Sequence, residues 1–379
     1  MPPSDEQAHE SGVRARLIEV VRLFGWLGVI GIGGPAAHIA LMRRRVVGRD
    51  RWVSEDDFAQ MVGACALVPG PNSTEMAMAL GARRAGWRGL VLGGGAFIIP
   101  AFVIVCAVAF VYEDVLTSAL IADLRRWLVP IVAAIVLDAL WKLRTTAIRD
   151  GRDGVVVVGA LLGAVLGVPE LLVLVVIGVV AMILRARPRP NTPVIAAVPL
   201  VIAGSPSLVA AVSPSLTKIL LVFLQIGSVI YGSGYVLLVF LESEVVDRGW
   251  IPTEVLLDAI SVGQFTPGPV FTTATFIGWH LGGFSGAVVA TLGIFGPSFV
   301  FAAFVDRVVS WAKRSPEFAA FLRGVSSGSI ALMAVVMWRL GDEAFVDVWA
   351  IATFAVAFVV IRLGMFGAAV RAVRSKRSV

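Results

Sequence analysis

The chain has 379 residues, of which 58% are hydrophobic and 15% charged, with a formal net charge of +6. Soluble domains contain about 45–50% apolar and about 25% charged residues, so this composition excludes an ordinary soluble domain. Residues 89–112 and 281–305 carry no charge, and each stretch exceeds the roughly 20 residues that a membrane-spanning helix needs. Because the basic residues lie in short loops between apolar runs, they indicate membrane orientation and not a nucleic-acid surface. We expect an all-α polytopic membrane protein.

A scarcity of reactive side chains argues against several function classes. The two cysteines, Cys65 and Cys106, both lie in apolar runs, and with three histidines in the chain neither a disulfide nor a metal site is expected. No Lys-Ser/Thr pair follows the glycines 93–95, so ATP-driven activity is not indicated. Paired carboxylates are also rare in the spans, so we expect no enzyme and no cofactor. Residues 1–16 precede no short apolar region with a cleavage site, and the first helix is expected to act as the insertion signal.

The predicted elements of the first half surround a helix-breaking triplet, Pro69-Gly70-Pro71. Proline lacks an N–H and disfavours a helical residue before it, while glycine tolerates unusual dihedral angles. In a membrane such a break survives only where it is buried in protein or lines a wet cavity. The expected elements are a long helix, two short helices around the triplet, two spans and two short apolar runs: about 17–42, 54–67, 72–83, 89–112, 120–143 and the runs on either side of 167–170.

The second half repeats this order at an offset of about 199 residues. Phe24 corresponds to Phe223, and the triplet recurs as Pro267-Gly268-Pro269. We expect a first transmembrane repeat over 1–185, a linker over 186–214 that contains an apolar stretch, and a second repeat over 215–379. Other matching stretches are Pro100-Ala101-Phe102 with Pro297-Ser298-Phe299, and Trp141-Lys142-Leu143 with Trp338-Arg339-Leu340. The expected elements of the second half are about 218–241, 253–265, 270–280, 286–305, 318–340 and 345–370.

Loop charges predict that the two repeats have opposite orientations. The loop after the first helix holds five arginines between residues 43 and 51, whereas its counterpart holds Arg248 beside acidic residues. Three arginines between 83 and 88 likewise have no charged counterpart in 281–286. Because cytoplasmic loops attract Lys and Arg, the pattern indicates inverted-topology repeats, each with a broken re-entrant helical hairpin that carries Pro-Gly-Pro at its tip. If the apolar stretch 195–212 spans the membrane, this inversion fails. The prolines in it and just after it, Pro199, Pro206 and Pro214, favour a non-spanning segment.

A helix that restarts after Pro-Gly-Pro presents free N–H groups and the positive end of its dipole, which together favour an anion. Two such starts could enclose one tetrahedral dianion, with an arginine (Arg43, Arg45 or Arg84) supplying charge. Glycines in the long helices would let the hairpin tips approach: Gly33, Gly34, Gly232 and Gly234. The candidate substrate-binding residues are Pro69, Gly70, Pro71, Asn72, Ser73, Thr74, Gln264, Pro267, Gly268, Pro269, Thr272, Thr273, Arg43 and Arg84.

Three carboxylates are candidates for coupling: Glu75, Glu242 and Asp138. Glu75 has a structural alternative, because Asn72 and a Glu three residues later can cap the helix start. Asp138 can pair with Lys142 four residues on. The arginines can serve as topology determinants only, and His38 can be either a titrating group or a packing residue.

The motifs resemble the chromate ion transporter (CHR) family in its two-domain form. The most specific stretches are Leu67-Val-Pro-Gly-Pro-Asn-Ser-Thr-Glu75 and Gly263-Gln-Phe-Thr-Pro-Gly-Pro-Val-Phe-Thr-Thr273, and further ones lie at 24–42, 84–87, 226–238 and 245–250. The resemblance implies a multi-pass protein of the bacterial inner (plasma) membrane that exports chromate, driven by the proton gradient, and confers chromate resistance. Sulfate is the similar competitor, and a sulfate or other small-anion transporter, exchanger or channel is the alternative. A homodimer is compatible with this resemblance. Cys65 stands where the second half has Gly263, so the first half has no equivalent of Gln264.

Overall fold

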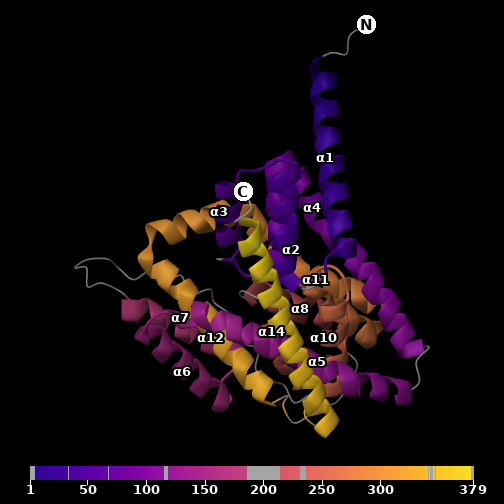
Figure 1. Cartoon of the computed structure of the whole chain (residues 1–379), viewed down its shortest axis with the longest axis vertical. Helices are drawn as coiled ribbons and strands as arrows, with labels where there is room; N and C mark the ends of the chain where they lie inside the picture. The colour runs from indigo at the N-terminus through magenta and orange to yellow at the C-terminus, as the bar shows by residue number, and fades with distance from the viewer. Residues whose placement is uncertain are drawn as a thin grey trace.

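The computed structural model describes residues 5–32, 34–66, 68–114, 118–185, 214–230, 236–339, 341, 345 and 347–376, and its regular elements in these ranges are helical (Figure 1). Three helices within them are long and apolar enough to cross a membrane: Asn72–Glu113, Val270–Val305 and Pro316–Trp338. The expected multi-pass, all-helical class is confirmed. The linker 186–214, except Pro214, lies outside the described residues, and so does the expectation for 195–212.

The same order of helices occurs in both halves. The first half contains α1 (Asp5–Ile30), α2 (Gly34–Arg43), the π-helical turn η1 (Arg44–Arg49), α3 (Glu55–Cys65), α4 (Asn72–Asp114), α5 (Ser118–Ala147), α6 (Gly151–Val165) and α7 (Glu170–Arg185). The second contains α8 (Leu216–Val229), α9 (Leu237–Leu241), the π-helical turn η2 (Glu242–Val246), α10 (Thr253–Phe265), the 3₁₀ turn η3 (Val270–Thr272), α11 (Thr273–Arg314), α12 (Pro316–Arg339) and α14 (Val348–Lys376). Even the π-helical turn recurs at the same place.

Both expected long helices break at their glycine clusters. α1 ends at Ile30 and α2 begins at Gly34, whose φ is +75°, while α8 ends at Val229 and α9 begins at Leu237. The prediction of continuous helices over 17–42 and 218–241 was wrong. Pro35 cannot donate the N–H that a continuous helix would use, and glycine adopts the positive φ at no steric cost. Three of the predicted glycines lie outside the described residues: Gly33, Gly232 and Gly234.

Each Pro-Gly-Pro triplet is followed by two helical arms that fold back on each other. α4 is interrupted at Ala85 and Gly86, and α11 at Gly282 and Gly283. Gly86 and Gly283 have φ values of +66° and +58°, which allow the sharp reversal. These breaks separate 72–84 from 87–114 and 273–281 from 284–314, as the sequence predicts.

Small residues bring the arms of each hairpin together. A Cβ on Gly81 would come within 3.0 Å of the Gly89 carbonyl, and one on Gly93 would lie 2.8 Å from the Ala77 carbonyl oxygen. This register places residue 70 level with about residue 100. In α11 the hydroxyls of Thr275 and Thr291 are 2.7 Å apart, which places residue 268 level with about residue 297. Both triplets therefore lie about halfway along the long second arms.

The two hairpins pack against each other at the centre of the molecule. α1 lies along α4, α8 lies along α11, and α4 contacts α11. In Figure 1 α6 and α7 lie together beside α12 at one edge, and α14 runs along α5. This arrangement brings the start of each hairpin to the interface between the halves.

Candidate functional site

The two triplets are held by reciprocal backbone hydrogen bonds. The Gly70 N–H donates to the carbonyl of Ile230 at the end of α8, over 2.7 Å. The Gly268 N–H donates to the carbonyl of Gly31 just after α1, also over 2.7 Å. Each triplet thus bonds the broken end of the first helix in the opposite half. The helix breaks and the triplets form one structural unit.

Both central glycines have positive φ values, +134° for Gly70 and +99° for Gly268. Their surroundings correspond across the two halves. Gly70 packs on the second arm of α11, where an added Cβ would lie 2.7 Å from Ser298 Oγ. Gly268 packs on the second arm of α4, where an added Cβ would lie 3.6 Å from Ala101 Cα. A side chain cannot be accommodated at either glycine, because each triplet lies in close contact with the hairpin of the other half there.

The first triplet is surrounded by polar atoms that have no protein partner. Thr74 and Ser298 are fully buried and Glu75 is 1% exposed. The Thr74 and Ser298 hydroxyls, both oxygens of Glu75 and Asn72 Oδ1 are buried and have no hydrogen-bond partner in the part of the chain that the structure describes. The capping alternative for Asn72 and Glu75 is therefore not observed. Ser73 is also buried in this first turn of α4. Since nearly all buried polar groups are satisfied, such a cluster points to an occupant.

The second triplet differs because its hydroxyls are already bonded. Thr272 Oγ1 donates to the Pro269 carbonyl over 2.8 Å, and Thr273 Oγ1 donates to the Val270 carbonyl over 2.9 Å. Gln264 lies buried in the last turn of α10, just before the triplet. The hydroxyl protons of this turn are not available to a ligand in this conformation.

His38 also lies at the second triplet. Its Nε2 is 2.9 Å from the Gly31 carbonyl oxygen, which accepts the Gly268 bond as well. The ring packs edge-on against Phe97, and Nδ1 has no hydrogen-bond partner among the residues that the structure describes. His38 thus supports the break after α1 through a hydrogen bond, in addition to its packing.

The predicted arginines lie away from the triplets in ion pairs. Arg43 Nε is 2.6 Å from Glu55 Oε1, and Arg84 Nη2 is 2.6 Å from Glu19 Oε2. Arg84 is twelve residues beyond Asn72 on α4, which corresponds to about 18 Å of helix. Arg84 faces a separate cavity of about 650 Å³ that also contains Arg45. That cavity is lined by Glu19, Arg22, Leu23, Trp26, Arg45, Asp50, Trp52 and Arg84.

The remaining predicted carboxylates are on other elements. Asp138 is buried in α5 and pairs with Lys142, and Arg362 of α14 lies 3.8 Å away. This geometry agrees with the ion-pair alternative. Glu242 is buried at the start of η2.

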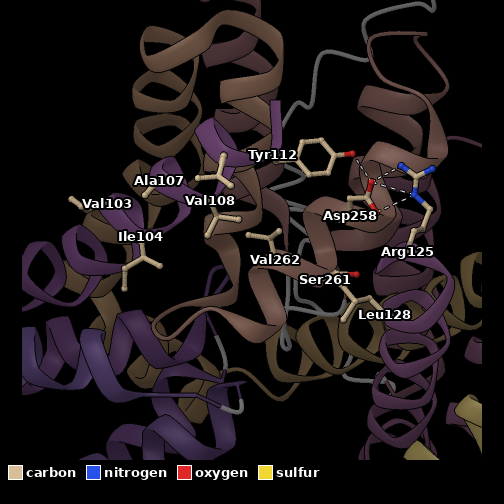
Figure 2. A pocket seen from close by; sticks show the side chains of 11 residues that line it. Val103, Ile104, Ala107, Val108, Tyr112, Arg125, Leu128, Asp258, Ser261 and Val262 are labelled. Atoms are coloured by element: carbon tan, nitrogen blue, oxygen red, sulfur yellow. Dashed lines mark hydrogen bonds and ion pairs between the residues drawn. The ribbon is translucent and has the colours of Figure 1, made fainter. Parts of the chain in front are cut away.

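A second pocket, of about 560 Å³, lies between α4, α5 and α10 (Figure 2). Its wall on α4 is apolar, and a polar network stands at one end. Asp258 accepts a 2.6 Å hydrogen bond from the Tyr112 hydroxyl and a two-point contact from Arg125, with Nη2–Oδ2 at 2.5 Å. Asp258 belongs to the second half and its two partners to the first, so this network ties the halves together.

The sequence arguments missed Ser298 and the Asp258 network. The repeat alignment contained a signal for Ser298, because Pro100-Ala101 faces Pro297-Ser298 and the hydroxyl exists in one half only. The pairing of Asp258 with residues more than 130 positions away had no local signal.

Comparisons with known proteins cover most of the chain. A family model described as "Chromate transporter" matches residues 18–184 and 217–373. The chain is 29% identical over 319 residues to a "Chromate transport protein" of Pseudomonas aeruginosa, covering 81% of this chain and 76% of the relative. It is 29% identical to a "Probable chromate transport protein" of Synechococcus elongatus, covering 85% of each. A "Chromate transport protein" of Cupriavidus metallidurans is 28% identical, with 88% and 84% covered. No solved structure matches the chain.

Proposed function

Because the chain belongs to the chromate transporter family, we propose that it is a secondary transporter that exports chromate across the bacterial inner membrane and so confers chromate resistance. Its curated relatives named as chromate transport proteins support the substrate. A bilayer-spanning protein with few reactive side chains suits transport better than catalysis.

The observation that carries the proposal is the polar cluster at the first triplet. It lies halfway along the second arms of the hairpins, at the contact between the halves, where broken helices of secondary transporters hold their substrates. The start of α4 supplies N–H groups and a positive dipole end, and Thr74 and Ser298 supply hydroxyl donors. These donors suit the oxygens of a small tetrahedral anion.

The transport cycle that we propose uses the two halves as inverted-topology repeats with re-entrant hairpins. The excess of loop arginines in the first half over the equivalent loops of the second supports this orientation. Rocking of one half against the other would then expose the triplets to either side in turn. Glu75 is the coupling residue in this scheme, since it is the buried carboxyl at the triplets without a partner.

Flux measurements on the purified protein in proteoliposomes test the proposal. We expect protein-dependent chromate flux that responds to an imposed pH gradient or membrane potential, and competition by sulfate. Sulfate flux without chromate flux would favour the alternative cargo, and unitary currents would favour a channel. In cells, equal chromate accumulation with and without the protein would contradict export.

A pair of threonine variants locates the site within the protein. Thr74→Val removes a hydroxyl without a partner, whereas Thr272→Val removes one already bonded to its own helix turn. We expect Thr74→Val to raise the KM for chromate several-fold and Thr272→Val to change it less. Equal effects of the two variants would argue against a site at the first triplet.

A further inference from the structure

We propose that Ser298 of α11 binds the transported oxyanion together with the start of α4, so that one anion is held at the first triplet and not symmetrically between the two. This inference rests on the proposed transport function and specifies its binding site. It assigns substrate contact to a residue of the second half at a helix start of the first half.

Ser298 has the burial and position that such a contact requires. Its side chain is fully buried and its Oγ has no partner among the described residues. It directly follows Pro297 in the long arm of α11 and faces Gly70, as the 2.7 Å approach to an added Cβ shows. A buried hydroxyl that lacks a partner costs about 1–3 kcal/mol, which an occupant offsets.

Glu75 approaches the same glycine, and Thr74 lies next to it in the chain. The Glu75 carboxyl approaches an added Cβ on Gly70 within 3.0 Å, so it lies on the same side of Gly70 as Ser298. Thr74 precedes it in the first turn of α4, with an unpaired buried hydroxyl. These side chains form a buried polar cluster at the N-terminus of α4, where the positive end of the helix dipole meets the triplet.

The equivalent place in the second half lacks these features. Ala101 stands where α11 has Ser298, and Thr273 stands where α4 has Glu75. The Thr273 hydroxyl is already donated to Val270. The asymmetry of available donors selects the first triplet as the anion site.

Glu75 sets the charge condition for binding. An ionised carboxylate would repel a dianion, while its protonated form would donate a further hydrogen bond to it. The anion is therefore bound together with a proton on Glu75. The one covalent change is the uptake of that proton by the carboxylate from the aqueous solution.

The ionisable groups around Glu75 leave this condition intact. In the interior of the packed helices these are His38 on α2, which bonds Gly31, Cys65 on α3, and Asp258 on α10, which bonds Arg125. The charged groups of α1, α3 and α11 whose burial is described are exposed, among them Glu19, Arg22, Glu55, Asp56, Asp57, His280 and Arg307. Among the described residues, the Glu75 carboxyl makes no ion pair and no hydrogen bond.

Ser298→Ala tests the assignment in the full-length protein in proteoliposomes, with chromate as the probe. We expect the KM for chromate to rise about tenfold, equivalent to about 1.4 kcal/mol, with kcat changed less. Ser329→Ala is the matched control, because Ser329 is buried in α12 but donates to the Val325 carbonyl over 2.9 Å. Ser298→Thr keeps the hydroxyl and is expected to retain most of the affinity.

The outcomes separate this proposal from the transport function. An unchanged KM in Ser298→Ala, with chromate flux intact in the parent protein, would overturn the Ser298 assignment alone and indicate that the site holds water. Absence of chromate flux in the parent would instead refute the proposed function. If Ser298→Ala does not fold, Ser298→Cys keeps the volume with a weaker donor, and a KM equal to that of the parent would again overturn the assignment.

Discussion

Replacement of Glu75 by glutamine tests whether a proton is bound with the anion. The Glu75 side chain is 1% exposed, in the first turn of α4, and both of its oxygens lack partners. Glutamine has nearly the same size, cannot ionise and still offers an N–H donor. The variant therefore changes the charge and the exchangeable proton while it leaves the volume of the site nearly unchanged.

Proton linkage sets the size of the expected effect. If the anion binds only when Glu75 is protonated, the apparent affinity falls about tenfold per pH unit over the range in which the free protein has lost that proton. The affinity for the anion is therefore highest at low pH and falls as the pH rises. In Glu75→Gln this slope is expected to vanish.

The charge moved per anion gives a second, independent readout. A dianion with one proton carries a net charge of −1, and in Glu75→Gln the same anion carries −2. Moving one elementary charge across a potential of 100 mV changes its free energy by about 2.3 kcal/mol. Because the variant moves two charges per anion and the parent moves one, the voltage dependence of flux is expected to double in the variant. A potential that is negative inside drives either complex outward, which agrees with export.

The assay is flux into and out of proteoliposomes at a series of pH values and imposed potentials. Sulfate is run in parallel as a competitor, because it stays a dianion over the series whereas chromate takes up a proton near neutral pH. Asp56→Asn, an exposed carboxylate in the first turn of α3, is the control and is expected to behave as the parent. An unchanged pH slope and an unchanged charge per anion in Glu75→Gln would refute the reasoning.

Two further changes test the architecture. Gly70→Ala puts a Cβ against Glu75 at a φ of +134° and is expected to destabilise the protein by about 2 kcal/mol, which a lower Tm in detergent would show. Gly95→Ala is the control, because a Cβ at Gly95 meets open space and should leave the Tm unchanged. Equal Tm values for the two variants would contradict the strain argument. Asp258→Asn leaves Arg125 without its charge partner and is expected to lower the stability of the protein by about 2 kcal/mol, again measured as a lower Tm. This value is at the low end for buried ion pairs because the Arg125 side chain is 27% exposed. An unchanged Tm would contradict a stabilising role of the pair.

Sequence periodicity and the internal offset were sufficient to predict most of the helical order. The short helix before each triplet and the two arms after it were placed correctly because Pro-Gly-Pro and the breaks at Ala85-Gly86 and Gly282-Gly283 interrupt helices locally. The breaks after α1 and α8 were not predicted, since a glycine cluster can equally permit close packing within a continuous helix. Both breaks are stabilised by tertiary bonds to the triplets, and Pro35 contributes to the first break only.

The composition of the site was harder to predict, because it depends on contacts between distant residues. Asn72 and Thr74 were named from their position at a helix start, where buried polar atoms without partners among the described residues do cluster. Arg84 was named because it is near in sequence, but twelve helical residues carry it about 18 Å away to Glu19. Ser298 was absent from the prediction because its neighbour Gly70 is far away in the chain.

The reciprocal bonds suggest why the two halves can differ in chemistry while they keep one framework. Gly70 with Ile230 and Gly268 with Gly31 use backbone groups only, so side chains beside them are free to change without loss of these bonds. Substitution at one member of each equivalent pair then gives one triplet a carboxyl and an unpaired serine and leaves the other with self-bonded threonines. If the halves move relative to each other during transport, both bonds are affected together, because each joins one half to the other. A bound anion at the polar triplet would thus bias the whole interface through a single site.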